Sequence, residues 1–153
     1  MRSDAHVCCN PELACPVARR CATRNGAGSG MIGAEDMHQF PNFMKSAANR
    51  IASVAQHTPD VEGYVFDGAD GTQIAFWECR ADANTEEHIH EFDEYFVVVE
   101  GCYTVTMDGK DIQVSAGQEC VIPRGTRISG SVVAGTRTIH MFGGRRAARN
   151  VEG

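Results

Sequence analysis

From Gly63 to Phe142 the sequence alternates apolar and polar residues in short runs, and turn residues interrupt these runs every eight to twelve positions. Because side chains two apart lie on the same face of a β-strand, this alternation predicts half-buried strands. Turn-forming pairs at 108–109, 116–117 and 134–135 indicate tight reversals. Many short antiparallel strands without intervening helices are typical of a β-sandwich or a closed barrel, so we predict an all-β domain. The expected strands cover residues 63–66, 72–79, 87–90, 94–100, 102–107, 111–114, 119–122, 127–133 and 136–142.

One helix is predicted ahead of the strands, over residues 41–56. Apolar residues recur there at spacings of three and four with polar residues between them, which is the pattern of an amphipathic helix. Pro41 suits the first turn of such a helix, and Pro59 prevents a longer one. The chain then divides into an extension (1–30), the helix and its lead-in (31–62), a β-barrel (63–144) and a basic tail (145–153).

The formal net charge of −6 is unevenly distributed over the 153 residues. Residues 1–30 and 145–153 each hold a net +2, so the region 31–144 holds −10. An acidic body repels phosphate backbones, so we expect no nucleic-acid partner and interpret the basic ends as solvated tails. The sequence has neither a run of about 18 uncharged apolar residues nor a signal-peptide core, which predicts no membrane partner and a cytoplasmic protein.

Four of the seven cysteines lie within the first 21 residues, at positions 8, 9, 15 and 21. Their spacing lacks the short gaps of zinc-finger and ferredoxin loops, so we interpret residues 1–30 as a poorly ordered extension. A metal or redox cluster formed by these cysteines is the alternative. Reduced thiols are expected throughout the chain, because no export signal is present. A glycine-rich linker ends at Met31, which could equally be the start of a shorter protein.

One strand-like segment carries metal-binding chemistry, with His88, His90 and Glu94 in the pattern His-x-His-x3-Glu. Two histidines that are two apart in a strand project their imidazoles to one side, within reach of a single cation. A turn after His90 would bring the carboxylate of Glu94 to the same ion. Two histidines and one carboxylate leave coordination positions open for a small ligand. The alternative is that both histidines merely form hydrogen bonds within a sheet.

These residues, with Gly101, resemble the first motif of the cupin family, G(X)5HXH(X)3-4E(X)6G, except that Asp82 replaces the leading glycine. Residues 117–128 resemble the second motif, G(X)5PXG(X)2H(X)3N, through Gly117, Pro123 and Gly125. The resemblance spans residues 63–144. It implies a small double-stranded β-helix, or jelly-roll, barrel with a divalent transition metal (Fe, Mn, Ni or Zn) near its mouth. It also implies a homodimer, because cupins typically pair to cover an exposed sheet edge.

The second motif departs from the family pattern at two positions, where Ile128 replaces the histidine and Val132 the asparagine. The position of Ile128 would supply the fourth protein ligand, yet three ligands suffice for a metal with open positions. His140 lies across the 134–135 reversal and could replace the missing ligand if residues 128 and 140 pair in a hairpin. A pairing that differs by one residue would turn His140 outward, which would make it a structural or surface histidine.

The strand alternation predicts a largely apolar wall around the metal. Tyr103 contributes a hydroxyl that could act as an acid or orient a ligand, although an ordinary core tyrosine is the alternative. Cys120 is interpreted as a small buried hydrophobe. Phe76 or Trp77 could join the wall from the strand over 72–79. The predicted inward-facing residues are Phe96, Val98, Tyr103, Val105, Met107, Ile112, Val114, Cys120 and Ile122.

Two hypotheses about function follow. In the first, the chain is a metal-dependent enzyme of the dioxygenase, isomerase or decarboxylase type that acts on a small organic molecule at His88, His90 and Glu94. In the second, it is a non-catalytic module that binds or senses a small molecule and whose metal site is weakened or empty. The intact first motif favours the enzyme, whereas Ile128 favours the binding module. The fold alone does not distinguish them.

Overall fold

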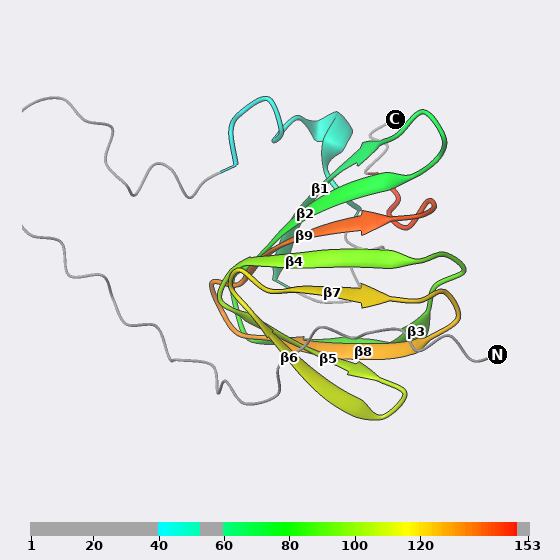
Figure 1. Ribbon diagram of the computed structural model, residues 1–153. Helices are drawn as coiled ribbons and strands as arrows, with labels where there is room; N and C mark the ends of the chain where they lie inside the picture. Colours follow the sequence, from blue (N-terminus) through cyan, green and yellow to red (C-terminus); the bar gives the residue numbers. More distant parts are fainter. Residues whose placement is uncertain (1–39, 53–59, 150–153) are drawn as a thin grey trace, which may run out of the picture.

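The computed structural model describes residues 40–52 and 60–149. Two antiparallel sheets face each other, and they lie closer together at one end than at the other (Figure 1). The first sheet has the strand order β1-β2-β9-β4-β7, and the second has the order β3-β8-β5-β6. The strands are β1 (Val61–Asp67), β2 (Gln73–Cys79), β3 (Ala83–Ile89), β4 (Glu94–Glu100), β5 (Cys102–Met107), β6 (Lys110–Ser115), β7 (Glu119–Ile122), β8 (Arg127–Val132) and β9 (Arg137–Phe142).

The predicted all-β class and every predicted strand are confirmed. The burial of side chains alternates along β2 and β4 as the sequence pattern requires. The largest difference is in β3, which begins at Ala83 and contains an irregularity between Thr85 and His88. The pair 108–109 closes the hairpin between β5 and β6, and Asp108 and Gly109 both have positive φ.

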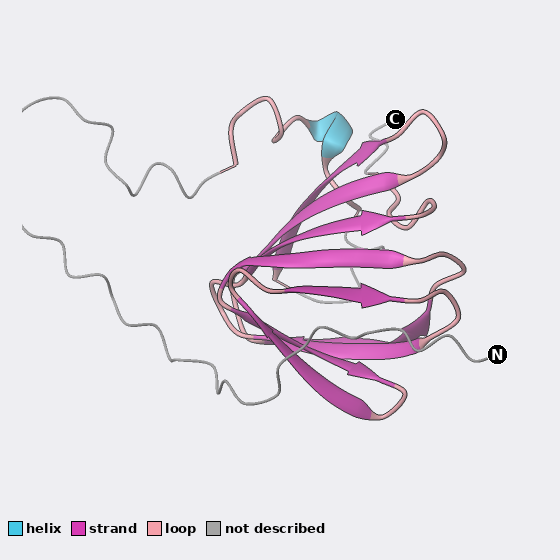
Figure 2. Cartoon of the chain, viewed as in Figure 1, coloured by secondary structure: helices cyan, strands magenta, loops and turns pink. Residues whose placement is uncertain are grey.

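The predicted helix over 41–56 is wrong in the part of the chain that the structure describes; residues 53–59 lie outside it. Only a 3₁₀ turn, η2 (Ala47–Asn49), forms, and strands and loops make up the rest of the described chain (Figure 2). Phe43, which the helical pattern would bury, is 75% exposed. Ile51 instead donates its backbone N–H to the carbonyl of Gly63 in β1 at 2.9 Å and buries its side chain in the core. Pairing with this edge supplies backbone partners that the isolated sequence does not reveal.

The interpretation of the basic end as a solvated tail is wrong for residues 145–149. Ala147 is only 2% exposed and packs in a core cluster with Ile51, Val65 and Trp77. Arg149 forms an isolated β-bridge with Ile51. The buried side-chain amide of Gln73 in β2 holds this segment through hydrogen bonds to its backbone. Residues 150–153 lie outside the described part.

A second cluster fills the space between the sheets. It contains most of the residues predicted to face inward, namely Phe96, Val98, Tyr103, Val105, Val114, Cys120 and Ile122, together with Ile128. Met107 and Ile112 pack against it. None of the three cysteines in the described residues, Cys79, Cys102 and Cys120, forms a disulfide. No helix in residues 40–52 and 60–149 is long and apolar enough to cross a membrane.

Candidate functional site

The His-x-His-x3-Glu motif lies where β3 turns into β4. His88 is near the end of β3, His90 follows that strand, and Glu94 begins β4. Two backbone hydrogen bonds hold the turn: Gly125 donates to the carbonyl of His90, and Gly143 donates to the carbonyl of Asp93, each at 2.8 Å. The ring centroids of His88 and His90 lie 4.7 Å apart. The expectation that both imidazoles lie on one side is therefore correct.

A partly open cavity of about 80 Å³ lies between the two sheets at this turn. Its polar lining brings together residues that are far apart in the sequence. These are Thr85, His88, His90, Glu94, Tyr103, Thr138, His140 and Arg146, and the apolar lining includes Trp77, Ile128 and Phe142. All five residues that the sequence analysis singled out as a possible ligand or acid thus border one cavity.

Glu94 is the centre of the polar contacts in this cavity. One carboxylate oxygen lies 2.5 Å from Nδ1 of His140, and the other lies 2.8 Å from Nδ1 of His90. Thr138 contacts the second nitrogen of His140 at 2.9 Å. Burial of the carboxylate, which is 4% exposed, raises its pKa, but the contacts with His140 and His90 outweigh burial and lower the pKa to about 2. Glu94 is therefore ionised at neutral pH.

His90 is buried with unsatisfied polar atoms. Among residues 40–52 and 60–149, neither of its ring nitrogens has a hydrogen-bond partner, and neither does Oε2 of Glu94. Nδ1 and Oε2 lie 2.8 Å apart as an ion pair and not as a hydrogen bond. The His90 ring stacks on Phe92 with a centroid distance of 5.2 Å. Buried polar atoms without partners are costly, so this pair of side chains is where a ligand would be accommodated.

The side chains of the motif do not converge as a finished coordination sphere. Nδ1 of His88 lies 2.7 Å from the carbonyl of Glu86 on its own strand. Within residues 40–52 and 60–149, no three His, Cys, Asp or Glu side chains are arranged to hold a metal ion. The possible ligands all line the cavity, but the carboxylate of Glu94 contacts the imidazoles of His90 and His140 directly.

The hairpin pairing of residues 128 and 140, which was the condition for His140 to replace the missing ligand, does not form. The 134–135 reversal connects the two sheets, so β8 pairs with β3 and β5, while β9 pairs with β2 and β4. Ile128 lies opposite His88, and His140 lies opposite Phe96. Both residues nevertheless line the cavity, because the faces of the two sheets oppose each other there. The inward position of His140 therefore comes from the packing of the two sheets and not from a hairpin with Ile128.

Tyr103 lines the cavity and is buried, with its ring against Gly130. A Cβ at Gly130 would lie 2.5 Å from the tyrosine ring and hydroxyl, so glycine is required there. Burial and the charge of Glu94 raise the pKa of Tyr103, so it keeps its proton at neutral pH. The rest of the predicted wall is core rather than cavity lining: of those nine residues, Tyr103 alone is in contact with the described cavity.

The sequence analysis missed Arg146, Thr138 and Cys79. Trp77 lines the cavity, whereas Phe76 packs on Phe40 and Phe66 outside it, which settles the register that the sequence left open. Burial raises the pKa of Cys79 to about 11, so this thiol is not a ready nucleophile. The interpretation of residues 145–153 as a solvated tail does not anticipate a role for Arg146. The sequence holds one signal for the position of Arg146, the glycine pair at 143–144. These glycines let the chain pass close to Phe92 just before Arg145 and Arg146.

Comparison with known proteins identifies the domain. The family model for the cupin domain matches residues 75–129. No curated protein sequence matches the chain. Among solved structures, KdgF from Halomonas sp. is similar with a TM-score of 0.53 and 20% identity, over 63% of this chain and 94% of that one.

Two further structures are similar. An RmlC-like cupin from Shewanella frigidimarina has a TM-score of 0.50 and 17% identity, over 61% of this chain and 80% of that one. Salicylate 1,2-dioxygenase from Pseudoaminobacter salicylatoxidans, in adducts with gentisate, has a TM-score of 0.51 and 19% identity, over 55% of this chain. The match spans only 25% of the dioxygenase chain. The family model thus places a cupin domain at residues 75–129, and at these identities the solved structures establish that the chain has the cupin jelly-roll fold.

Proposed function

We propose that this cupin domain binds one divalent transition metal ion, Fe, Mn, Ni or Zn, through His88, His90 and Glu94, and acts on a small organic molecule at that ion. The observation that carries the proposal is the buried pair formed by His90 and Glu94 in the cavity, whose ring nitrogens and Oε2 lack hydrogen-bond partners in the part of the chain that the structure describes. Each unsatisfied buried group costs about 1–3 kcal/mol. Ligation of a cation would offset that cost with the donor atoms that are already present.

The donor chemistry fits such an ion. Imidazole nitrogen and carboxylate oxygen are the ligands of the two-His, one-carboxylate sites that leave coordination positions open. Glu94 is ionised at neutral pH because its pKa is about 2, so it is ready to bind a cation. When bound, the ion would serve as a Lewis acid or lower the pKa of a bound water.

His140 is the fourth candidate ligand. Its Nδ1 contacts Glu94 and its Nε2 contacts Thr138, so both nitrogens are engaged in the structure. Either it exchanges one of these contacts for the ion, or it orients the carboxylate of Glu94. The variant His140→Ala separates these roles: a ligand role predicts much weaker metal binding, and an orienting role predicts nearly unchanged stoichiometry. Tyr103 is proposed as an acid or as a hydrogen-bond donor to the substrate from the cavity wall.

A non-catalytic binding or sensing module is the second candidate, and two observations favour it. The apolar side chain of Ile128 lies opposite His88, where the family pattern places a further ligand. The contact between His140 and Glu94 also satisfies one carboxylate oxygen without an ion. In this case the cavity would bind its small molecule through the polar lining alone.

Metal analysis tests the proposal. The purified full chain is incubated with each of the four ions in turn, dialysed, and assayed by elemental analysis. We expect one equivalent of metal in the wild type and in Glu91→Ala, a control that removes an exposed carboxylate beside the motif. The triple variant His88→Ala, His90→Ala, Glu94→Ala should bind none. Full metal content in the triple variant would refute the ligand assignment, and a metal-free wild type after reconstitution would support the binding module.

A further inference from the structure

The segment after β9 is fastened across the first sheet, and we call residues 145–149 the C-terminal strap. Its backbone pairs with the segment before β1: Ala52 donates to the carbonyl of Ala148 at 2.9 Å, and Arg149 bridges to Ile51. The strap reaches this position past Phe92, where a Cβ at Gly144 would lie 2.6 Å from the ring. Phe92 in turn stacks on His90. The strap is therefore packed next to the candidate site.

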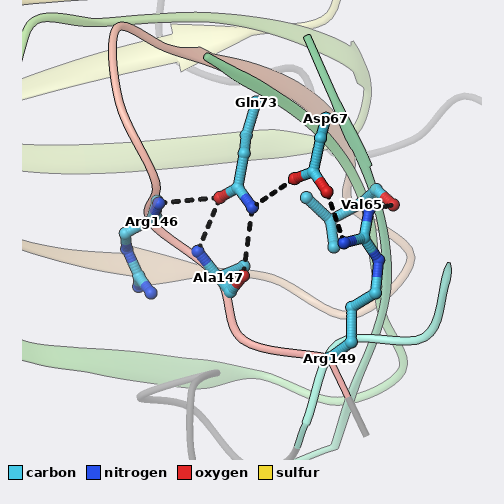
Figure 3. Close-up of polar contacts among 6 residues, drawn as sticks. All are labelled: Val65, Asp67, Gln73, Arg146, Ala147 and Arg149. Carbon is cyan, nitrogen blue, oxygen red and sulfur yellow. Dashed lines mark hydrogen bonds and ion pairs between the residues drawn. The ribbon is translucent and has the colours of Figure 1, made fainter. Parts of the chain in front are cut away.

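Gln73, at the start of β2, makes four hydrogen bonds, three of them to the strap (Figure 3). Its Oε1 accepts the backbone N–H groups of Arg146 and Ala147, at 2.7 and 2.8 Å. Its Nε2 donates to the carbonyl of Ala147 at 3.2 Å and to Asp67 at 2.8 Å. Gln73 is only 3% exposed. A buried amide with all of these partners holds the backbone at Arg146 in one place.

Arg149 closes the other end of the strap. Its guanidinium donates to the carboxylate of Asp67 at 2.5 Å and to the carbonyl of Val65 at 3.1 Å. Asp67 thus joins Arg149 and Gln73 in one network (Figure 3). Both ends of the strap are therefore anchored to β1 and β2, and these contacts with the sheet fix the backbone position of Arg146.

The side chain of Arg146 leaves this network and lines the cavity. Figure 3 shows it directed away from Gln73 and Arg149. It borders the cavity with Glu94 and Tyr103, whereas the side chain of the preceding residue, Arg145, is exposed. A half-buried guanidinium stays protonated and carries several N–H donors in a planar fork, so two of them can pair with the two oxygens of a carboxylate while the others keep contacts within the protein.

We propose that Arg146 recognises the carboxylate of the small molecule that occupies this cavity, so that the ligand belongs to the class of small organic acids. This inference rests on the proposed function in one respect, that the cavity is the ligand site, and it does not require the metal. A cavity of about 80 Å³ admits only a few heavy atoms, so a larger acid would place its carboxylate end inside and the rest in the open mouth.

The chain offers a direct probe for the test. Trp77, its one tryptophan, lines the same cavity, so intrinsic fluorescence reports on occupancy there. The full chain is titrated with propionate and with propionamide, a neutral molecule of nearly the same shape, after chelation of metal and again after metal loading. The chelated sample isolates the arginine, because a carboxylate can also bind a metal directly. Arg145→Gln is the matched control, since it removes the same charge one residue away.

In the chelated samples, we expect propionate to bind the wild type and Arg145→Gln alike, and to bind Arg146→Gln roughly tenfold or more weakly. Propionamide should bind all three proteins weakly. Arg146→Lys, which keeps the charge but loses the fork, should fall between wild type and Arg146→Gln, and it provides the comparison if Arg146→Gln does not fold. Equal affinity of wild type and Arg146→Gln for propionate, or equal binding of acid and amide by wild type, would overturn the inference.

Metal content is measured on every sample. If no sample binds metal but propionate binding depends on Arg146, the proposed metal function fails and the assignment of Arg146 stands. If metal binds through the motif but propionate binding is indifferent to Arg146, the ligand class is wrong and the metal site stands.

Discussion

Replacing Gln73 with methionine tests whether the strap is part of the folded domain. Methionine has nearly the same length but none of the polar atoms, so Gln73→Met removes four hydrogen bonds without opening a large cavity. Each such bond contributes about 1 kcal/mol net, which gives about 4 kcal/mol if the strap stays in place with unpaired backbone groups. If the strap is released, water forms hydrogen bonds with those backbone groups, which limits the loss in the free energy of unfolding. We therefore expect the free energy of unfolding to fall by roughly 2–4 kcal/mol.

Two measurements check this expectation. Urea unfolding gives the change in stability, and amide hydrogen exchange shows where it arises. The amides of Ala52 and Ala147, which donate to Ala148 and Gln73 respectively, should exchange much faster in the variant. The amides of β4 should still exchange only when the whole domain unfolds. Lys110→Met, at an exposed position on β6, should change stability by less than about 0.5 kcal/mol. A loss below about 1 kcal/mol with Ala52 and Ala147 still protected would refute the reasoning.

Further predictions concern the cavity and the assembly. Ile128→His should raise metal affinity on the order of a hundredfold in a dialysis assay, because it adds an imidazole opposite His88 and a four-ligand zinc site binds with about 10–16 kcal/mol. In the metal-free protein, the lowered pKa of Glu94 contributes about 3 kcal/mol to the free energy of unfolding. This contribution is present above pH 4.5 and is lost as the pH falls through about 2. Urea titrations of Glu94→Gln should lack this pH dependence. Gly130→Ala should lower the free energy of unfolding by about 1–3 kcal/mol, because its Cβ meets the ring of Tyr103. Light scattering should report about twice the monomer mass if the chain forms the homodimer expected of cupins.

The strands and the motif could be predicted from the sequence because both depend on local patterns. Period-two alternation determines which side chains of β2 and β4 face inward, and the two-residue spacing places His88 and His90 on one side. Turn residues such as Gly109 then delimit each strand. This information lies within a few residues and does not depend on tertiary partners.

The helix, the strap and the cross-sheet neighbours could not be predicted for the same reason. Apolar spacing in 41–52 fits a helix, but the edge of β1 offers Ile51 a backbone partner that only the folded sheet provides. The position of Arg146 depends on Gln73, which is 73 residues away. His140 faces Glu94 because β9 lies beside β4, and that pairing order does not follow from either strand alone.

The central claim, that His90 and Glu94 hold a metal ion, is tested most directly by anomalous diffraction. Crystals of the full chain grown with zinc would be measured on both sides of the zinc absorption edge. The account predicts one anomalous peak within about 2.0–2.2 Å of a His90 nitrogen and a Glu94 oxygen. A zinc peak elsewhere on the molecule, with none at these two residues, would contradict it.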